Sequence, residues 1–401
     1  MIDIKTKAYQ KASFALALGS FLVFCNLYLF QPLLPLLADE FQVSATRVNW
    51  IQAAGTLMLS LSLVPWAITS EIKGRRPIML GSLFALPLIG LTYLLADNLW
   101  ALTLTRALMG FALAGFAAIA VAYMAEEFTE RALMMAMGSY IAANSLGGIT
   151  GRVVGGLISE FWSWQGAAIV MTCLSLIGAL VVSRLLPAQQ HFSSQSHSLR
   201  FQGRAIIHIL KQPKLLTAMM IGGINFALFM NLYSVMGFRL VEAPYSLPVG
   251  WVSLIFLCYL SGTLSSRLSG FWRQKYRASS GMLLGNSLSA LGMWVAAWES
   301  LPAVLAGLLL ISFGSFFTHS LAYGWISHRA TTAKASASAL YLVHYYVGGS
   351  LGGFFLLGCW QYKGWPAVLA GGMVLYSVIY LLCLKLKQYE KNDFSPVPST
   401  T

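Results

Sequence analysis

Residues 138–156 read GSYIAANSLGGITGRVVGG, and this stretch decides the fold that the sequence predicts. Gly147, Gly151 and Gly155 recur every four residues and therefore lie on one side of a helix. Glycines at this spacing let two helices approach closely inside a membrane. The stretch belongs to an apolar run over 132–159, which exceeds the roughly 20 residues needed to cross a bilayer. We therefore expect a membrane-spanning helix that packs tightly against a neighbour.

The whole chain has the composition of a membrane protein. Of its 401 residues, 57% are hydrophobic and 10% are charged, whereas soluble domains carry about 25% charged residues. Inside lipid the backbone must satisfy its own hydrogen bonds, so these spans are expected to be helices. The apolar runs predict an all-α integral membrane protein with twelve spans, over 12–37, 48–69, 78–96, 99–125, 132–159, 165–186, 215–238, 248–267, 280–298, 302–326, 335–357 and 365–384.

The distribution of lysine and arginine predicts the orientation of these spans. The formal charge is +13, and the cations gather in alternate loops, as they do in the cytoplasmic loops of membrane proteins. With both termini in the cytoplasm, the outer segments contain only three cations, Arg47, Arg239 and Lys363. Topology thus explains the positive charge, and no groove-reading motif indicates nucleic acid as a partner.

A polar break divides six spans from six. We expect an N-terminal six-helix bundle over 1–186, a cytoplasmic linker over 187–214, a C-terminal six-helix bundle over 215–384 and a cytoplasmic tail over 385–401. Two dipeptides recur at nearly the same spacing, Ala122-Tyr123 as Ala322-Tyr323 and Gly147-Gly148 as Gly348-Gly349. The two bundles are therefore predicted to be pseudo-symmetric repeats, an arrangement that suits alternating access.

The loop between the second and third spans reads EIKGRRP over 71–77. Gly74 allows a tight turn, and Glu71, Arg75 and Arg76 place opposite charges at the helix ends. An ordinary positively charged loop with a turn is the alternative interpretation. The acid, the spacing and the Gly-Arg-Arg ending resemble the loop signature of the major facilitator superfamily. This resemblance implies the superfamily's fold, a small-molecule substrate, and charges that lock the cytoplasmic helix ends in one state.

The fourth and fifth spans resemble the drug/proton antiporter branch of that superfamily. Arg106 corresponds to the arginine of the branch's fourth span, which implies a role in binding or coupling; snorkelling to the outer interface is the alternative. Arg152 stands where the branch's fifth-span motif has proline, so the hinge role of that proline does not carry over directly. Tight helix packing alone is the alternative meaning of the motif glycines. The glycines that match the motif are Gly138, Gly147, Gly151, Gly155 and Gly156.

Within the superfamily, the chain resembles a bacterial group labelled arabinose-efflux-type permeases. Glu127 and Arg131 follow the fourth span, where the family often has an acid and an arginine that join the cytoplasmic gate; ordinary interfacial charges are the alternative. The resemblance extends over almost the whole chain and implies export from the bacterial inner membrane. The local matches are Gln31-Pro32-Leu33-Leu34-Pro35, His319-Ser320 and Tyr345-Tyr346.

All thirteen acidic residues lie outside the spans or at their ends. Two cations inside the spans without an acid there favour an anionic or a neutral polar substrate. Proton coupling is expected to use His319, His344 or a helix-end acid such as Asp39, because histidine titrates near neutral pH; hydrogen-bonded packing is the alternative for either histidine. The candidate substrate and coupling residues are Arg106, Arg152, Asn26, Gln31, Asn144, Asn225, Asn231, His319, His344 and Tyr341.

The sequence argues against other classes of membrane protein. It contains no P-loop, no HExxH and no GxSxG pattern, so neither ATP-driven transport nor an enzyme is expected. The five cysteines have no paired spacing, so no metal site, disulfide or cofactor is expected. We expect a monomer in the lipid bilayer that exports small molecules in exchange for protons. An importer or uniporter of a polar or anionic metabolite is the alternative, and a channel or receptor is the weaker one.

Overall fold

The computed structural model describes residues 1–192, 206–329 and 334–392. Within this part of the chain the structure is helical, apart from turns and one isolated β-bridge between Ile2 and Phe128. The predicted all-α class is confirmed. The predicted linker over 187–214 and the predicted tail over 385–401 lie partly outside the described residues.

The chain forms two compact units, each of which combines two stretches of sequence. The first consists of Met1–His197 and Met236–Leu257, and the second of Ser198–Val235 and Cys258–Thr401. Helices of the first half of the chain are α1 (Lys7–Tyr28), η1 (Gln31–Leu33), α2 (Leu34–Glu40), α3 (Ala45–Val48), α4 (Trp50–Lys73), α5 (Arg75–Thr92), η2 (Tyr93–Leu95), α6 (Leu99–Ala117), α7 (Ala120–Glu127), α8 (Glu130–Phe161) and α9 (Trp164–Leu185). Helices of the second half are α11 (Pro213–Val241), α12 (Val249–Val252), η3 (Ser253–Cys258), α13 (Tyr259–Lys275), α14 (Ala278–Val295), α15 (Leu301–Arg329) and α16 (Lys334–Asn392).

Helical segments occur at all twelve predicted spans. Ten segments are long and apolar enough to cross a membrane. One of them, within α16, holds two predicted spans, because the backbone is non-helical at Lys363 and Gly364. The remaining predicted span is α14, an 18-residue helix with several polar residues. Several helices extend beyond their predicted ends, as α4 does to Lys73, since hydropathy marks the hydrocarbon and not the end of the helix.

The first predicted span is broken. The apolar run is continuous in sequence, but α1 ends at Tyr28 and the chain continues through the short helix η1 into α2. Pro32 and Pro35 follow this break, and proline has no N–H to donate to the preceding turn. Broken helices are tolerated at membrane depth only where other groups satisfy the freed backbone, so this break needs hydrogen-bond donors from elsewhere in the unit.

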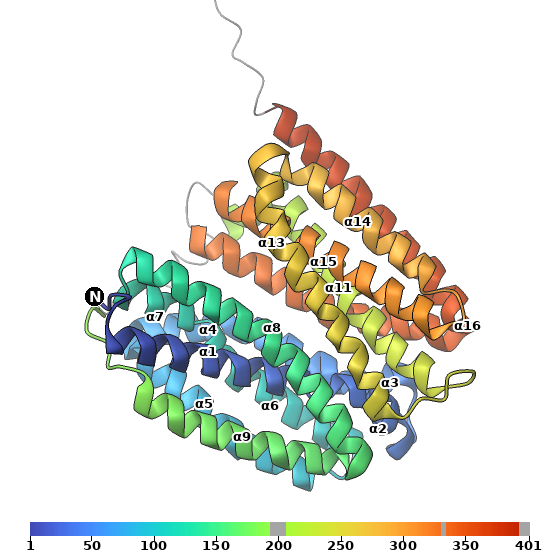
Figure 1. The fold of residues 1–401 in the computed structure, drawn as a ribbon, viewed down its shortest axis with the longest axis horizontal. Helices are drawn as coiled ribbons and strands as arrows, with labels where there is room; N and C mark the ends of the chain where they lie inside the picture. The colour runs from blue at the N-terminus through green and yellow to red at the C-terminus, as the bar shows by residue number, and fades with distance from the viewer. Residues whose placement is uncertain (193–205, 330–333, 393–401) are drawn as a thin grey trace, which may run out of the picture. The chain divides into compact units, whose positions relative to one another are not determined.

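Glycines bring α8 against α1 in the first unit, and the two helices run side by side (Figure 1). A methyl group at Gly151 would lie 2.6 Å from Cα of Cys25, and one at Gly147 would lie 2.9 Å from Cα of Phe21. One at Gly155 would lie 2.7 Å from the carbonyl oxygen of Leu29. The contacts therefore repeat every four residues on both helices.

The same packing recurs in the second unit between α16 and α11. A methyl group at Gly348 would lie 2.9 Å from Cα of Gly223, and one at Gly352 would lie 2.7 Å from Cα of Ala227. Gly147 and Gly348 are 201 positions apart, and Gly151 and Gly352 are separated equally. The fifth predicted span of each half thus packs on the first span of that half in the same way.

Candidate functional site

Arg106, in the middle of α6, is fully buried and satisfies the end of α1. Its Nη1 donates to the carbonyl oxygen of Asn26 at 2.9 Å, and its Nη2 donates to that of Leu27 at 2.6 Å. Nη1 also donates to the hydroxyl of Tyr93 at 3.1 Å, and the guanidinium lies 5.1 Å from the ring centroid of Phe30. The last turn of a helix leaves carbonyls without intrahelical donors, and Arg106 supplies donors for two of them.

Arg152, on α8, is buried against the other side of the same break. Its Nε donates to Oε1 of Gln31 at 2.7 Å, and its Nη1 donates to the carbonyl oxygen of Gly148 at 2.7 Å. Its Cζ lies 3.7 Å from the ring centroid of Tyr28 and 4.8 Å from that of Phe256. Aromatic faces attract cations, more so when water is excluded. Both predicted arginines therefore converge on the break between α1 and η1.

The asparagine candidates tie helices together. In the first unit, Nδ2 of Asn26 donates to Oγ of Ser175 at 2.9 Å, and Oδ1 of Asn144 accepts from Oγ of Ser20. Asn26 thereby links α1 to α9, and Asn144 links α8 to α1. Because these side chains are engaged with neighbouring helices, the geometry gives them a packing role in this structure.

The asparagines of the second unit make the same kind of bond. Nδ2 of Asn225 donates to the carbonyl oxygen of Ser315 at 3.0 Å, and Nδ2 of Asn231 donates to that of Gly349 at 2.8 Å. Both asparagines are on α11 and are buried. They therefore fix α11 to α15 and α16.

His319, Tyr341 and their neighbours form an aromatic cluster in the second unit. Nδ1 of His319 lies 2.9 Å from the hydroxyl of Tyr341, and its ring centroid lies 4.4 Å from that of Tyr345. Tyr345 stacks on Phe226 with centroids 3.8 Å apart. Tyr345 and Phe226 were not predicted as site residues, although the spacing of Tyr341 and Tyr345 by one helical turn is a signal for a shared face.

His344 lies apart from this hydrogen bond. Its Nδ1 is 2.8 Å from the carbonyl oxygen of Leu340, one turn earlier on α16. A carbonyl accepts a hydrogen bond, so this contact places a proton on Nδ1. The structure therefore brings His319 and Tyr341 together and leaves His344 bonded to its own helix.

The loop between α4 and α5 forms an ion pair with the end of α7. Nη2 of Arg75 lies 2.9 Å from Oε1 of Glu126, and Nη1 of Arg75 donates to Oγ of Ser70 at 2.6 Å. Gly74 has φ of 96°, in the left-handed region that favours glycine. Glu126, which is not among the predicted gate residues, pairs with the motif arginine. Glu71, at the end of α4, is half-buried.

Arg76 and Glu127 hold the segment that follows α9. Nε and Nη2 of Arg76 donate to the carbonyl oxygens of Leu186 and Ser183, each at 3.0 Å. The carboxylate of Glu127 is 1% exposed and accepts from the backbone N–H groups of Gln190 and His191. Residues just after α9 are therefore bound to the first unit.

Arg131 takes no part in these contacts. It is exposed on the first turn of α8 and has no ion pair within the described ranges. The predicted gate residues thus separate into a connected set and one exposed cation.

Comparison with known proteins identifies the family. The model of the Major Facilitator Superfamily matches residues 16–353. Inner membrane transport protein YnfM of Escherichia coli (strain K12) is 33% identical over 390 residues, which cover 94% of this chain and 90% of that protein. The chain belongs to the Major Facilitator Superfamily. The uncharacterised MFS-type transporter YybF of Bacillus subtilis (strain 168) is 32% identical over 383 residues, which cover 94% of this chain and 93% of that protein.

Solved structures of Major Facilitator Superfamily transporters share the fold. A bacterial homologue of the human lysosomal transporter Spinster superposes with a TM-score of 0.80 at 14% identity, and the match covers 98% of this chain and 100% of that one. A point mutant of the nucleoside transporter NupG gives a TM-score of 0.76 at 14% identity, covering 94% and 99%. The predicted superfamily and fold are confirmed, and the chain is a multi-pass membrane transporter.

Two motif glycines of this superfamily member behave differently from the others. A methyl group at Gly156 would lie 2.6 Å from Oγ of Ser253, so Gly156 admits η3 to the surface of α8. A methyl group at Gly138 would meet nothing within 4 Å. Close packing therefore accounts for four of the five matched glycines, and Gly138 has no packing reason in this structure.

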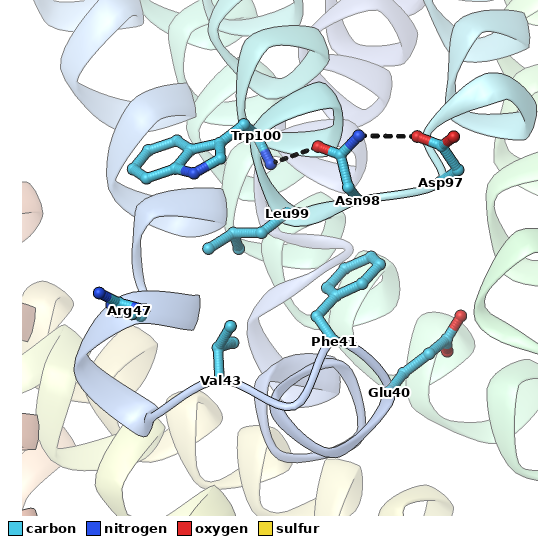
Figure 2. Close-up of a pocket in the computed structure, with 8 residues that line it drawn as sticks. All are labelled: Glu40, Phe41, Val43, Arg47, Asp97, Asn98, Leu99 and Trp100. Carbon is cyan, nitrogen blue, oxygen red and sulfur yellow. Dashed lines mark hydrogen bonds between the residues drawn. The ribbon is translucent and has the colours of Figure 1, made fainter.

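A pocket of about 450 Å³ opens at the end of the first unit that carries the loops after α2 and η2 (Figure 2). Oδ1 of Asn98 accepts from the backbone N–H of Trp100, and Nδ2 of Asn98 donates to Asp97 (Figure 2). None of the predicted site residues lines this pocket, which is formed by Glu40, Phe41, Val43, Arg47, Asp97, Asn98, Leu99 and Trp100.

The described residues contain no group of three or more His, Cys, Asp and Glu side chains that could hold a metal ion. The five cysteines are free thiols, and three of them, Cys25, Cys258 and Cys383, are buried.

Proposed function

We propose that this chain is a secondary active transporter that exports small polar or anionic molecules in exchange for protons. The substrates belong to the drug-like, sugar or organic-anion classes, and transport proceeds by alternating access in the bacterial inner membrane, with both termini in the cytoplasm. The observation that carries the proposal is the pair of buried arginines, Arg106 and Arg152, in spans without an acidic residue.

The charge of these arginines supports an anionic or polar substrate. Arg106 has no ion pair in the part of the chain that the structure describes. Its hydrogen bonds to carbonyl oxygens hold it in place but leave its net positive charge. In a medium of low dielectric constant such a charge acts over a longer distance than in water. A substrate anion would therefore be attracted without a direct contact to Arg106.

The pairing of His319 with Tyr341 supports a proton-binding role for His319. The imidazole is half-buried, and its Nδ1 is hydrogen-bonded to the tyrosine hydroxyl. Its Nε2 makes no hydrogen bond with a described residue, so a proton or a substrate group can be added there. His344, whose Nδ1 contacts its own helix, is the less suitable carrier.

The contacts of Arg75 and Arg76 support a cytoplasmic gate. Arg75 joins α5 to the end of α7, and Arg76 joins α5 to the end of α9. Because ion pairs and hydrogen bonds of partly exposed side chains are weak, they can break and re-form during a transport cycle. Glu127 adds the segment after α9 to the same group.

Flux of charged dyes into inverted membrane vesicles tests the proposal. The probes are fluorescein as an anion and ethidium as a cation, each measured with a proton gradient and after the gradient is collapsed by a protonophore. The matched variants are Arg106→Lys, which keeps the charge, and Arg106→Gln, which removes it. We expect gradient-dependent fluorescein flux that is retained in part by Arg106→Lys and lost in Arg106→Gln, with ethidium transported poorly by all three proteins.

Gradient-independent flux of fluorescein would contradict proton antiport and favour the uniporter alternative. Gradient-driven flux in the opposite direction would favour an importer. Equal transport of ethidium and fluorescein in all variants would contradict the proposal that the buried arginines favour anionic substrates.

A further inference from the structure

The N-termini of α5 and α14 lack a cap from their own chain neighbours. The residues that precede them, Gly74 and Arg277, provide no side-chain hydrogen bond to the helix. The first turn of any helix has unpaired N–H groups and a partial positive charge. Each of these helices, the third span of its half, therefore needs an acceptor from another element.

In the first unit the acceptor comes from the segment after α9. Oε1 of Gln189 accepts from the backbone N–H of Arg76 at 2.9 Å. The guanidinium of Arg76 donates in return to the carbonyl oxygens of Ser183 and Leu186, in the last turn of α9 and just after it. The start of the third span and the end of the sixth are thereby tied together by reciprocal hydrogen bonds.

In the second unit, Glu390 near the end of α16 accepts from a side chain of the first turn of α14 and not from its backbone. Its carboxylate is 3% exposed; Oε2 accepts from Oγ of Ser279, in the first turn of α14. Oε1 accepts from Nε1 of Trp325 on α15 at 2.9 Å. α14 and α16 run beside one another (Figure 1). One carboxylate thus connects the third, fourth and sixth spans of the second half.

Gln189 and Glu390 occupy repeat-related positions. They are 201 positions apart, the spacing that separates Gly147 from Gly348. In each unit, a side chain at or just beyond the end of the sixth span accepts a hydrogen bond from the first turn of the third. The charged group differs between the units. In the first unit it is Arg76, on the third span, and in the second unit it is Glu390, on the sixth span.

We propose that Glu390 is a gate-positioning residue, the counterpart in the second unit of the tie that Gln189 and Arg76 make in the first. A buried carboxylate is a costly way to pack helices, since an apolar side chain would need no partners. No Lys or Arg forms an ion pair with Glu390 within the described ranges. The carboxylate of Glu390 lies at the positive end of α14. If its hydrogen bonds to Ser279 and Trp325 break, the ends of α14, α15 and α16 come free of one another together.

Two cysteine reporters test this role without a substrate. The first protein keeps Cys383 alone; this buried thiol lies two turns before Glu390 on α16. The second protein has no native cysteine and carries Ser253→Cys. The Ser253 side chain is buried beside Gly156, near the C-terminal end of α8. In each purified protein, the rate of labelling by a water-soluble maleimide is compared between Glu390, Glu390→Ala and the control Glu299→Ala, an exposed acid beyond the far end of α14.

We expect Glu390→Ala to speed the labelling of Cys383 about tenfold, because two buried donors lose their acceptor. If the tie biases the transport cycle, the same variant slows the labelling of Ser253→Cys at least about twofold, since opening one end closes the other in alternating access. Glu299→Ala should change neither rate. Faster labelling of Cys383 with an unchanged rate at Ser253→Cys would make Glu390 a packing residue, and unchanged rates at both would also overturn the proposal.

If Glu390→Ala does not purify as a monodisperse protein, Glu390→Gln and Trp325→Phe take its place. Glu390→Gln keeps an acceptor without the charge, and Trp325→Phe removes one donor. Both are expected to move the two rates in the same directions by smaller factors, and failure of both to do so counts against the gate role. These readouts use no substrate, so they fail independently of the proposed export activity.

Discussion

The two units pack their first and fifth spans alike, but the polar side chains buried beside these spans differ between the units. In the first unit, α1 breaks after Tyr28 and Arg106 bonds to its last carbonyls. The first span of the second half, α11, is continuous from Pro213 to Val241. At the 200-position spacing of Ala122 and Ala322, Arg106 corresponds to Ala306; at the 201-position spacing of Gly147 and Gly348, Arg152 corresponds to Gly353. Arg106 is therefore present where a helix break leaves carbonyl groups for it to satisfy, and Arg152 lies beside the same break.

This comparison separates what the repeat preserves from what it varies. The glycine contacts fix the distance between the first and fifth spans in both units, so the two units have the same close packing of backbones. The second unit has His319 and Tyr341 in its aromatic cluster, and the first unit has the two buried arginines, Arg106 and Arg152. A division of labour follows, in which one unit carries fixed charge and the other carries an imidazole that can bind and release a proton.

The largest effect is expected when the shared packing is broken. Gly151→Val would place its side chain against the backbone of Cys25, and Gly352→Val would do the same at Ala227. Because backbone cannot move aside as a side chain can, each change should cost about 3 kcal/mol or more and reduce the yield of folded protein. Size-exclusion profiles and thermal unfolding in detergent measure this.

Gly138→Ala is the matched control, because a methyl group there meets nothing within 4 Å. It should leave the melting temperature unchanged or slightly higher. If only one of the two valine variants were destabilised, the units would not share their packing and the comparison would fail.

The next effect concerns the difference between the units. Arg106→Ala would leave the buried carbonyl of Asn26 without its side-chain donor, and that of Leu27 with only the longer bond from Nε2 of Gln52 at 3.5 Å. We expect a loss of about 2–4 kcal/mol, seen as a lower melting temperature. Arg131→Ala, at an exposed cation, is the control and should change stability by less than about 0.5 kcal/mol. A tolerated Arg106→Ala would mean that the break in α1 does not depend on the arginine.

Much of the fold was predictable because membrane helices leave a strong signal. Apolar runs gave all twelve spans, and the four-residue spacing of Gly147, Gly151 and Gly155 predicted a close helix contact that the structure contains. The break in the first span was missed, because Pro32 and Pro35 lie within an apolar run and hydropathy does not register backbone donors.

The contacts of the site were less predictable than its members. The arginines and His319 stood out as rare polar residues in apolar spans, but their partners are backbone carbonyls and a tyrosine from distant positions. The sequence does not determine whether Glu126 or Glu127 faces Arg75, since neighbouring acids at a helix end differ only in the direction they face. Glu390 was read as part of a tail because it lies among lysines after the last apolar run.

A smaller effect should separate the gate of the first unit from its core. Arg75 and Glu126 have side chains that are 12% and 28% exposed, so their ion pair is screened and should contribute about 0.5–1 kcal/mol. A double-mutant cycle with Arg75→Ala and Glu126→Ala, followed by thermal unfolding, measures this coupling. The exchange Arg75→Glu with Glu126→Arg should restore part of it. A coupling energy near zero would show that the pair does not hold α5 to α7.

The smallest effect on stability is expected at His319, where the functional effect should be the most specific. The glutamine amide can form a hydrogen bond with the Tyr341 hydroxyl in either direction, so His319→Gln should change the unfolding free energy by less than about 0.5 kcal/mol. Glutamine cannot take up a proton, so the dependence of dye flux on pH should flatten. His344→Gln is the matched control and should keep the wild-type profile, because Nδ1 of His344 is bonded to its own helix. A flat profile in His344→Gln with an unchanged one in His319→Gln would place the titrating group on α16 instead of α15 and would contradict the role proposed for His319.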